Sequence, residues 1–360
     1  MKRLPHFIET QQLTVPWLEE DFYPLVDEMQ ALLEKREEGF ISSPVRPELQ
    51  GKNIVELFFG ASTRTNLSFQ FAAHELSATN FATDNASISL SVAKDETLRD
   101  TLQVISGYST VDLIVLRTPI DGKEDLSIKN AVQFSSKPVI SAGDRNLQHP
   151  TQTLVDLYTI RKKKGRLNDL TLGLGGDLGG SRTIKSLIYM AARYRMRLVL
   201  ISPKGFRIPD DLRNWLDKHE IEYIETHDAK KEAHRIEVYY VVRTQKENAN
   251  STHRDTLGKY GPPAFYSANK ELLDILPSDT PILHPLPRTR PTAEMLYGEI
   301  GTRKIKKAEA ELPYETDDDP RATYFQQAKY GQSVRMALLI TLLTEPYRTI
   351  FLEKTNPLTF

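Results

Sequence analysis

Four consecutive residues, Ser62-Thr63-Arg64-Thr65, carry the hydrogen-bond donors that a phosphate-sized dianion requires. They follow an apolar run that predicts a strand over 54–59, and they would open the next helix. Hydroxyls, a guanidinium and the unpaired N–H groups of a first helical turn would then converge on one point. This stretch alone leaves one alternative open, a Ser or Thr that only caps the helix beside a surface Arg.

Further cationic and neutral donors occur where other predicted strands end or helices begin. Few acidic residues accompany them as candidate general acids or bases. Such a set suits a doubly anionic pair of substrates whose reaction is accelerated by positioning and by stabilisation of developing charge. The set comprises Arg64, Arg117, His149, Gln152, Arg182, Arg243, Gln245 and Arg288.

The elements that must position these donors alternate between strand and helix in both halves of the chain. This alternation predicts an α/β protein with parallel sheets and right-handed crossovers, and ligands of such sheets bind at the carboxyl ends of the strands. The predicted strands are 54–59, 111–117, 138–143, 170–174, 197–201, 236–242 and 281–283, and the predicted helices are 16–36, 67–76, 98–108, 149–164, 182–194 and 324–343.

Length and composition exclude several classes of function. A chain of 360 residues suggests two domains, and 47 Lys and Arg against 48 Asp and Glu argue against nucleic acid or an anionic membrane as the main partner. No apolar run is long enough for a membrane span or a signal peptide, so we expect a cytoplasmic protein. With no Cys, disulfides, thiolate catalysis and Cys-ligated metals are excluded.

The glycine cluster at 173–180 invites a dinucleotide-binding interpretation, which its spacing does not support. The fingerprint that begins at Gly173 requires Gly where Leu178 stands, and the next strand does not end in an acidic residue that would hold a ribose. No Gly-Lys-Ser/Thr forms a P-loop, no two His have a metal-ligand spacing, and no Ser lies in a nucleophile elbow. We therefore expect neither a metal nor a cofactor.

Several motifs together resemble the aspartate/ornithine carbamoyltransferase family over about residues 5–345. The H-P-L-P-R stretch and R-T-Q-K-E favour the catalytic chain of the aspartate enzymes, because the ornithine enzymes carry Cys where Pro285 stands. The matching motifs are Ser62-Thr63-Arg64-Thr65, His149-Pro150-Thr151-Gln152-Thr153-Leu154-Val155-Asp156, Arg243-Thr244-Gln245-Lys246-Glu247, His284-Pro285-Leu286-Pro287-Arg288 and Tyr324-Phe325-Gln326-Gln327-Ala328.

The resemblance implies transfer of a carbamoyl group from carbamoyl phosphate to the amino group of L-aspartate, for pyrimidine biosynthesis. It implies two doubly wound parallel-sheet domains with the active site in the cleft between them. Residues 1–147, completed by the C-terminal helix 325–345, would bind carbamoyl phosphate, and residues 148–324 would bind aspartate. A homotrimer with shared active sites is implied, and a regulatory chain is left open.

The resemblance also assigns roles to individual residues. Thr65, Arg117 and His149 would polarise the carbonyl oxygen, and Gln152 would take the carbamoyl NH2. The phosphate would be held by Ser62, Thr63, Arg64, Thr65 and Arg117, and the substrate would be placed by the carbonyls of Leu286 and Pro287. The aspartate carboxylates would be bound by Arg182, Arg243 and Gln245. A neighbouring subunit's site would receive Ser91 and Lys94, with Lys94 reaching the aspartate.

Some positions depart from the family pattern. Gly60, Asn66 and Asn248 replace a Glu and two Arg that tie the domains shut, Asp95 replaces a Gly beside Lys94, and Arg145 replaces another Gly. The Glu that normally comes three residues after H-P-L-P-R is matched by Glu311, 23 residues after Arg288, so about 20 residues are inserted near 289–310. The insertion is either a tolerated surface loop or part of a reshaped acceptor site. A carbamoyltransferase with another amino acceptor and a non-catalytic binding or scaffold protein are the alternative functions.

Overall fold

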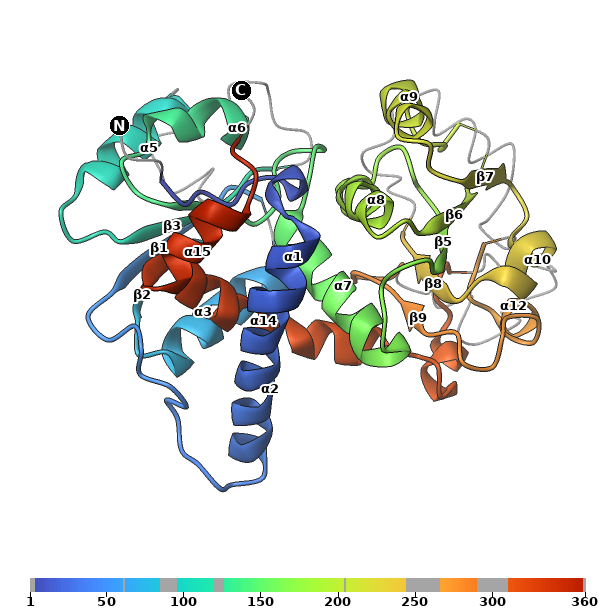
Figure 1. The fold of residues 1–360 in the computed structure, drawn as a ribbon, viewed down its shortest axis with the longest axis horizontal. Helices are drawn as coiled ribbons and strands as arrows, with labels where there is room; N and C mark the ends of the chain where they lie inside the picture. The colour runs from blue at the N-terminus through green and yellow to red at the C-terminus, as the bar shows by residue number, and fades with distance from the viewer. Residues whose placement is uncertain are drawn as a thin grey trace, which may run out of the picture. The chain divides into compact units, whose positions relative to one another are not determined.

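The structure is a computed structural model that describes residues 4–60, 62–84, 96–119, 126–203, 205–243, 266–289 and 310–358 (Figure 1). The chain divides into two compact units, Met1–Tyr158 with Lys329–Phe360, and Thr159–Ala328. Two helices, α7 (Pro150–Lys164) and α14 (Tyr324–Leu343), run across this division. The domain bounds drawn from the sequence stay a prediction.

The first unit contains a parallel sheet with the strand order β2-β1-β3-β4. The chain passes from β1 to the strand on one side and then to the strand on the other, so the winding reverses between β1 and β3. The edge strand β2 was not predicted, because its polar sequence has no continuous apolar run. The strands are β1 (Asn53–Phe58), β2 (Thr79–Asp84), β3 (Leu113–Arg117) and β4 (Val139–Ser141).

Two helices of this unit begin where the sequence provides a cap or a proline. The hydroxyl of Thr97 accepts from the Asp100 N–H at 3.1 Å at the start of α5, and Pro150 is the first residue of α7. Buried Leu57, Leu102 and Ile114 belong to the core of β1, α5 and β3. The other helices are α1 (Val15–Trp17), which continues through a π-helical turn (Leu18–Phe22) into α2 (Tyr23–Glu37), α3 (Thr63–Glu75), α5 (Leu98–Gly107), α6 (Ile128–Ala131) and α15 (Tyr347–Lys354).

The second unit contains a parallel sheet with the strand order β7-β6-β5-β8-β9. Its winding reverses between β5 and β8, so both sheets have the doubly wound arrangement that the family resemblance implied. Strand β7 and helix α9 were not predicted. The elements are β5 (Thr171–Gly175), α8 (Arg182–Arg193), β6 (Arg197–Ile201), α9 (Asp210–Lys218), β7 (Tyr223–Thr226), α10 (Ala229–Glu232), β8 (Val238–Val241), α12 (Lys270–Leu273) and β9 (Ile282–Leu283).

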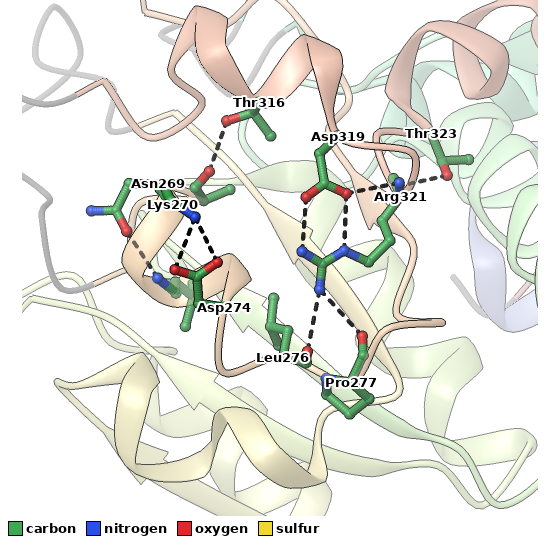
Figure 2. A network of polar contacts seen from close by, with 11 residues as sticks. Asn269, Lys270, Asp274, Leu276, Pro277, Thr316, Asp319, Arg321 and Thr323 are labelled. Carbon is green, nitrogen blue, oxygen red and sulfur yellow. Dashed lines mark hydrogen bonds and ion pairs between the residues drawn. The ribbon is translucent and has the colours of Figure 1, made fainter.

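The segment 310–323 returns to this sheet after the insertion. The guanidinium of Arg321 donates two hydrogen bonds to the Asp319 carboxylate, at 2.8 and 2.9 Å, and reaches the carbonyls of Leu276 and Pro277 (Figure 2). The Ile282 N–H donates to the Arg321 carbonyl at 2.9 Å. These contacts hold the segment that follows the insertion beside β9 and the residues after α12.

In the described part of the chain, no helix combines the length and the apolar character that a membrane crossing requires.

Candidate active site

The predicted phosphate turn lies at the carboxyl end of β1. Helix α3 begins at Thr63, and Ser62 occupies the N-cap position with an extended backbone, at φ −161° and ψ 100°. The Ser62 side chain makes no capping hydrogen bond, so the capping alternative lacks the contact that defines it. The first turn of α3 therefore keeps the donors with which a helix N-terminus binds an anion.

Arg64 adds a positive charge to this turn. Its side chain is exposed, and no carboxylate of the described residues forms an ion pair with it. Partial burial lowers the pKa of its guanidinium, which nevertheless remains a cation at physiological pH. The next residue, Thr65, is buried at 7% exposure. A cation without a protein counter-charge beside an uncapped helix start is arranged to receive an anion.

Arg117 and His149 come together beside the same turn. Arg117 ends β3 and lies opposite Phe58 in the register of β1 and β3. Its Nη1 donates to the Ala142 carbonyl at 3.2 Å and lies 3.5 Å from Nε2 of the buried His149. The other ring nitrogen of His149, Nδ1, faces the Thr151 hydroxyl at 3.3 Å.

Gln152 follows His149 in the first turn of α7. Its N–H donates to the His149 carbonyl at 3.0 Å, and its Nε2 donates to Oδ1 of Asp156 at 2.8 Å. The residues predicted for carbamoyl phosphate in this unit therefore follow β1, end β3 or begin α7. These elements meet at the point where the winding of the sheet reverses, which is where open α/β sheets bind ligands.

In the second unit, Arg182 and Arg243 lie at the corresponding edge. Arg182 is the first residue of α8 and is 5% exposed, while Arg243 follows β8. Strands β5 and β8 are neighbours, with Gly175 opposite Val241. The two guanidiniums thus follow the strands between which this second sheet reverses its winding, at the edge where an anionic ligand is expected.

Leu286 and Pro287 follow β9 and are joined by a cis peptide bond. The Leu286 N–H donates to Nδ1 of His284 at 2.8 Å, so the proton of this imidazole is on Nε2. That nitrogen lies 3.3 Å from Oε1 of Glu311. Oε1 also accepts from the Thr289 N–H at 2.7 Å.

Glu311 is the residue matched from the sequence to the family's Glu after H-P-L-P-R. Its contacts with His284 and Thr289 place it beside that motif. Burial alone raises the pKa of this carboxyl, but the hydrogen bonds from His284 and Thr289 outweigh it and leave the pKa below its ordinary value. Glu311 closes a buried chain of contacts to the Leu286 backbone across the insertion. Sequence reasoning identified the position of Glu311 but assigned it no role.

Several predicted residues lie outside the described part of the chain, namely Ser91, Lys94, Gln245, Asp95 and Asn248. Of the other departures, Asn66 is buried within α3 and its Oδ1 accepts from Gln70 Nε2. Gly60 packs closely, since a Cβ there would lie 3.3 Å from the Pro119 Cα. Among the described residues, no cluster of three His, Asp or Glu has the arrangement of a metal site.

Fold and site together define a protein of two parallel α/β units, each with arginine side chains where the winding of its sheet reverses. Residues 5–162 match the family model of the carbamoyl-phosphate-binding domain of aspartate/ornithine carbamoyltransferases, and residues 168–342 match the model of the Asp/Orn-binding domain. The chain belongs to this family.

Individual relatives are similar to this chain in sequence along most of their length. The chloroplastic aspartate carbamoyltransferase of Oryza sativa subsp. japonica is 36% identical over 345 residues, which cover 95% of this chain and 85% of that protein. The catalytic subunit of the Clostridium novyi (strain NT) enzyme is 36% identical over 333 residues, or 89% and 97% of the two chains. Aspartate transcarbamoylase from Trypanosoma cruzi, solved in complex with carbamoyl phosphate, superposes with a TM-score of 0.76 at 27% identity, covering 95% and 97%.

Proposed function

We propose that this chain transfers the carbamoyl group of carbamoyl phosphate to the amino group of L-aspartate, giving N-carbamoyl-L-aspartate and phosphate for pyrimidine biosynthesis. The observation that carries the proposal is the turn at the start of α3, where the Ser62 cap is absent and Arg64 has no carboxylate partner among the described residues. A phosphate group supplies both missing interactions at once.

The reaction needs positioning and charge stabilisation. Ser62, Thr63, Arg64, Thr65 and Arg117 hold the phosphate, while Thr65, Arg117 and His149 surround the carbonyl oxygen. The amino nitrogen attacks the carbonyl carbon, and negative charge develops on that oxygen. The C–O bond to phosphate then breaks, and the departing phosphate takes up the proton that the amino nitrogen loses. Preorganised donors lower the barrier because they stabilise the charge where it develops, in an environment with little free water.

The acceptor is a dicarboxylate in this proposal. Arg182, Arg243 and Gln245 bind the aspartate carboxylates, and the carbonyls of Leu286 and Pro287 place the reacting groups. Two guanidiniums favour the negative side chain of aspartate over the positive side chain of ornithine, because like charges repel. A contact of Lys94 with the aspartate belongs to the same proposal.

We further propose a cytoplasmic homotrimer in which Ser91 and Lys94 enter a neighbouring active site. Three large apolar side chains support an interface on the first unit, since Leu67 and Phe71 on α3 and Phe81 on β2 are 41%, 53% and 56% exposed. Strand β2 is a sheet edge and leads directly into the segment that carries Ser91 and Lys94. Association with a regulatory chain is a separate question for the purified protein.

One assay tests the activity. Phosphate release from carbamoyl phosphate is followed with L-aspartate, with L-ornithine and without an acceptor, and N-carbamoyl-aspartate is identified by mass. Turnover with aspartate alone supports the proposal. Turnover with ornithine only would assign another acceptor, and absence of turnover together with tight binding of carbamoyl phosphate would favour a non-catalytic homologue.

A further inference from the structure

A buried group of charged side chains lies in the first unit behind Gln152. Glu56 on β1, Asp156 on α7 and Arg335 on α14 are 0%, 0% and 3% exposed. Burial of a charge is costly unless its partners compensate for it. Asp156 of this group contacts Gln152, a proposed substrate ligand, and so connects the group to the site.

Asp156 determines which end of the Gln152 amide can meet a substrate. The two residues lie four positions apart on α7, on one face of the helix, and the contact is 2.8 Å. A carboxylate can only accept, so the NH2 of Gln152 must face Asp156. Gln152 Oε1 then points away from Asp156, and among the described residues it has no hydrogen-bond partner. An acceptor oxygen is left available for an N–H of the substrate.

Arg335 is a buried cation whose charge interacts with those of Glu56 and Asp156. Burial lowers the pKa of Arg335 to about 10, while the charges of Glu56 and Asp156 act to raise it, so the guanidinium is charged at neutral pH. Its Nη1 donates to the Gly331 carbonyl at 2.8 Å, and its centre lies 5.2 Å from the ring of Phe69 on α3.

We infer that Asp156 is a positioning residue that fixes the Gln152 amide with its oxygen toward the carbamoyl NH2. The inference rests on the proposed function, because it takes the carbamoyl group as the ligand of Gln152. Without Asp156 the amide can rotate and present its own NH2 to the carbamoyl NH2, two donors that cannot pair.

The test compares carbamoyl phosphate with inorganic phosphate, which lacks the group that Gln152 recognises. In Asp156→Ala we expect the KM for carbamoyl phosphate to rise by about 10- to 100-fold, while the inhibition constant of inorganic phosphate stays within about twofold of wild type. Asp156→Asn, which retains an acceptor oxygen, should lose only about fivefold because its hydrogen bond is no longer charge-assisted. A parallel rise of both constants would mean that Asp156 only maintains the fold, and would overturn the inference.

A double-mutant cycle gives an independent readout. If Asp156 acts through Gln152, Asp156→Ala added to Gln152→Ala should raise the KM for carbamoyl phosphate by no more than about twofold beyond Gln152→Ala alone. Additive losses would contradict the relay. Thr153→Val is the matched control on α7, because Thr153 is buried and its hydroxyl has no partner, so both constants should stay at wild-type values.

These outcomes are separable from failure of the proposed function. Wild-type protein that binds neither carbamoyl phosphate nor phosphate in calorimetry would remove the proposed function itself. Wild-type protein that binds both, with an Asp156→Ala variant equally tight for both, would remove only the positioning role. If Asp156→Ala does not fold, the ratio of the two constants in Asp156→Asn decides the question in the same way.

Discussion

Replacement of Glu311 by Ala should destabilise the second unit strongly. Glu311 and His284 are each 1% exposed, and one carboxylate oxygen accepts from His284 Nε2 at 3.3 Å and from the Thr289 N–H at 2.7 Å. Removal of the acceptor leaves the buried His284 donor and the partly buried Thr289 N–H unpaired. Each unpaired donor costs about 1–3 kcal/mol, so we expect a loss of about 2–5 kcal/mol in the free energy of unfolding. Glu311→Gln keeps an acceptor oxygen and should lose about 1 kcal/mol.

The measurement can be restricted to this unit. The chain has two Trp residues, Trp17 in the first unit and Trp215 on α9 in the second. In a Trp17→Phe background, urea unfolding followed by fluorescence reports on Trp215 alone. Glu315→Ala is the matched control, because Glu315 is exposed in the same segment, and its change should stay within about 0.5 kcal/mol.

The size of the loss in Glu311→Ala tests whether Glu311 closes a buried network. A loss under 1 kcal/mol for Glu311→Ala would refute the argument that Glu311 closes a buried network across the inserted residues. Because the pKa of Glu311 lies below its ordinary 4.5, its charged form contributes stability at neutral pH. That contribution should be lost as the pH falls through the folded-state pKa, and it should be absent from the Glu311→Gln variant.

Four further predictions concern other parts of the chain. Arg64→Ala should lower kcat/KM by about 100-fold or more in the phosphate-release assay and leave the urea midpoint unchanged, because the side chain is exposed and has no ion pair among the described residues. Burial lowers the pKa of His6 from 6.5 to about 4, so the free energy of unfolding should fall by about 3 kcal/mol as the pH drops from 6.5 to 4, a slope that His6→Gln should flatten. Deletion of 291–309 with a short Gly/Ser linker should leave a folded protein with the free energy of unfolding within about 1 kcal/mol, measured by urea unfolding. Gly60→Glu should not raise activity, since its Cβ would lie 3.3 Å from the Pro119 Cα and the two Arg partners of the family pattern are absent.

Each of these has an outcome that contradicts it. An active Arg64→Ala enzyme would misplace the phosphate site, and equal pH slopes in wild type and His6→Gln would mean that another group titrates. An unfolded deletion variant would show that the insertion supports the fold, whereas a folded variant with altered KM for aspartate would show that it shapes the acceptor site. A large gain of activity in Gly60→Glu would contradict the last prediction, because it would mean that the Glu of the family pattern can act without its two Arg partners.

Local sequence determined the elements that carry the site. An apolar run followed by Ser-Thr-Arg-Thr predicts a strand and then a helix, and the structure places β1 and α3 there. The terminal helix was predicted over 324–343 from its apolar pattern and over 325–345 from the resemblance, and the structure has α14 over Tyr324–Leu343. These elements could be predicted because apolar periodicity and end signals are properties of neighbouring residues. The edge strands β2 and β7 were missed, since pairing with a neighbouring strand, rather than an apolar run, stabilises them.

The arrangement of the site depended on tertiary structure. Arg117 and His149 are 32 positions apart in the sequence, and they meet because β3 and the start of α7 reach the same sheet edge. His284 and Glu311 are 27 positions apart, and they pair because the segment after the insertion returns to β9. The contact between Gln152 and Asp156 is the exception, because helical periodicity alone places them on one face.

The sequence by itself thus determined which residues could bind a doubly anionic substrate, that strands and helices alternate, and which family the motifs resemble. Only the tertiary structure decided that Arg117 meets His149 at one sheet edge and that Glu311 pairs with His284 across the insertion. The physical reason is that hydrogen-bond direction depends on distances of about 3 Å between groups, and such distances are set by the folding of remote segments onto one another.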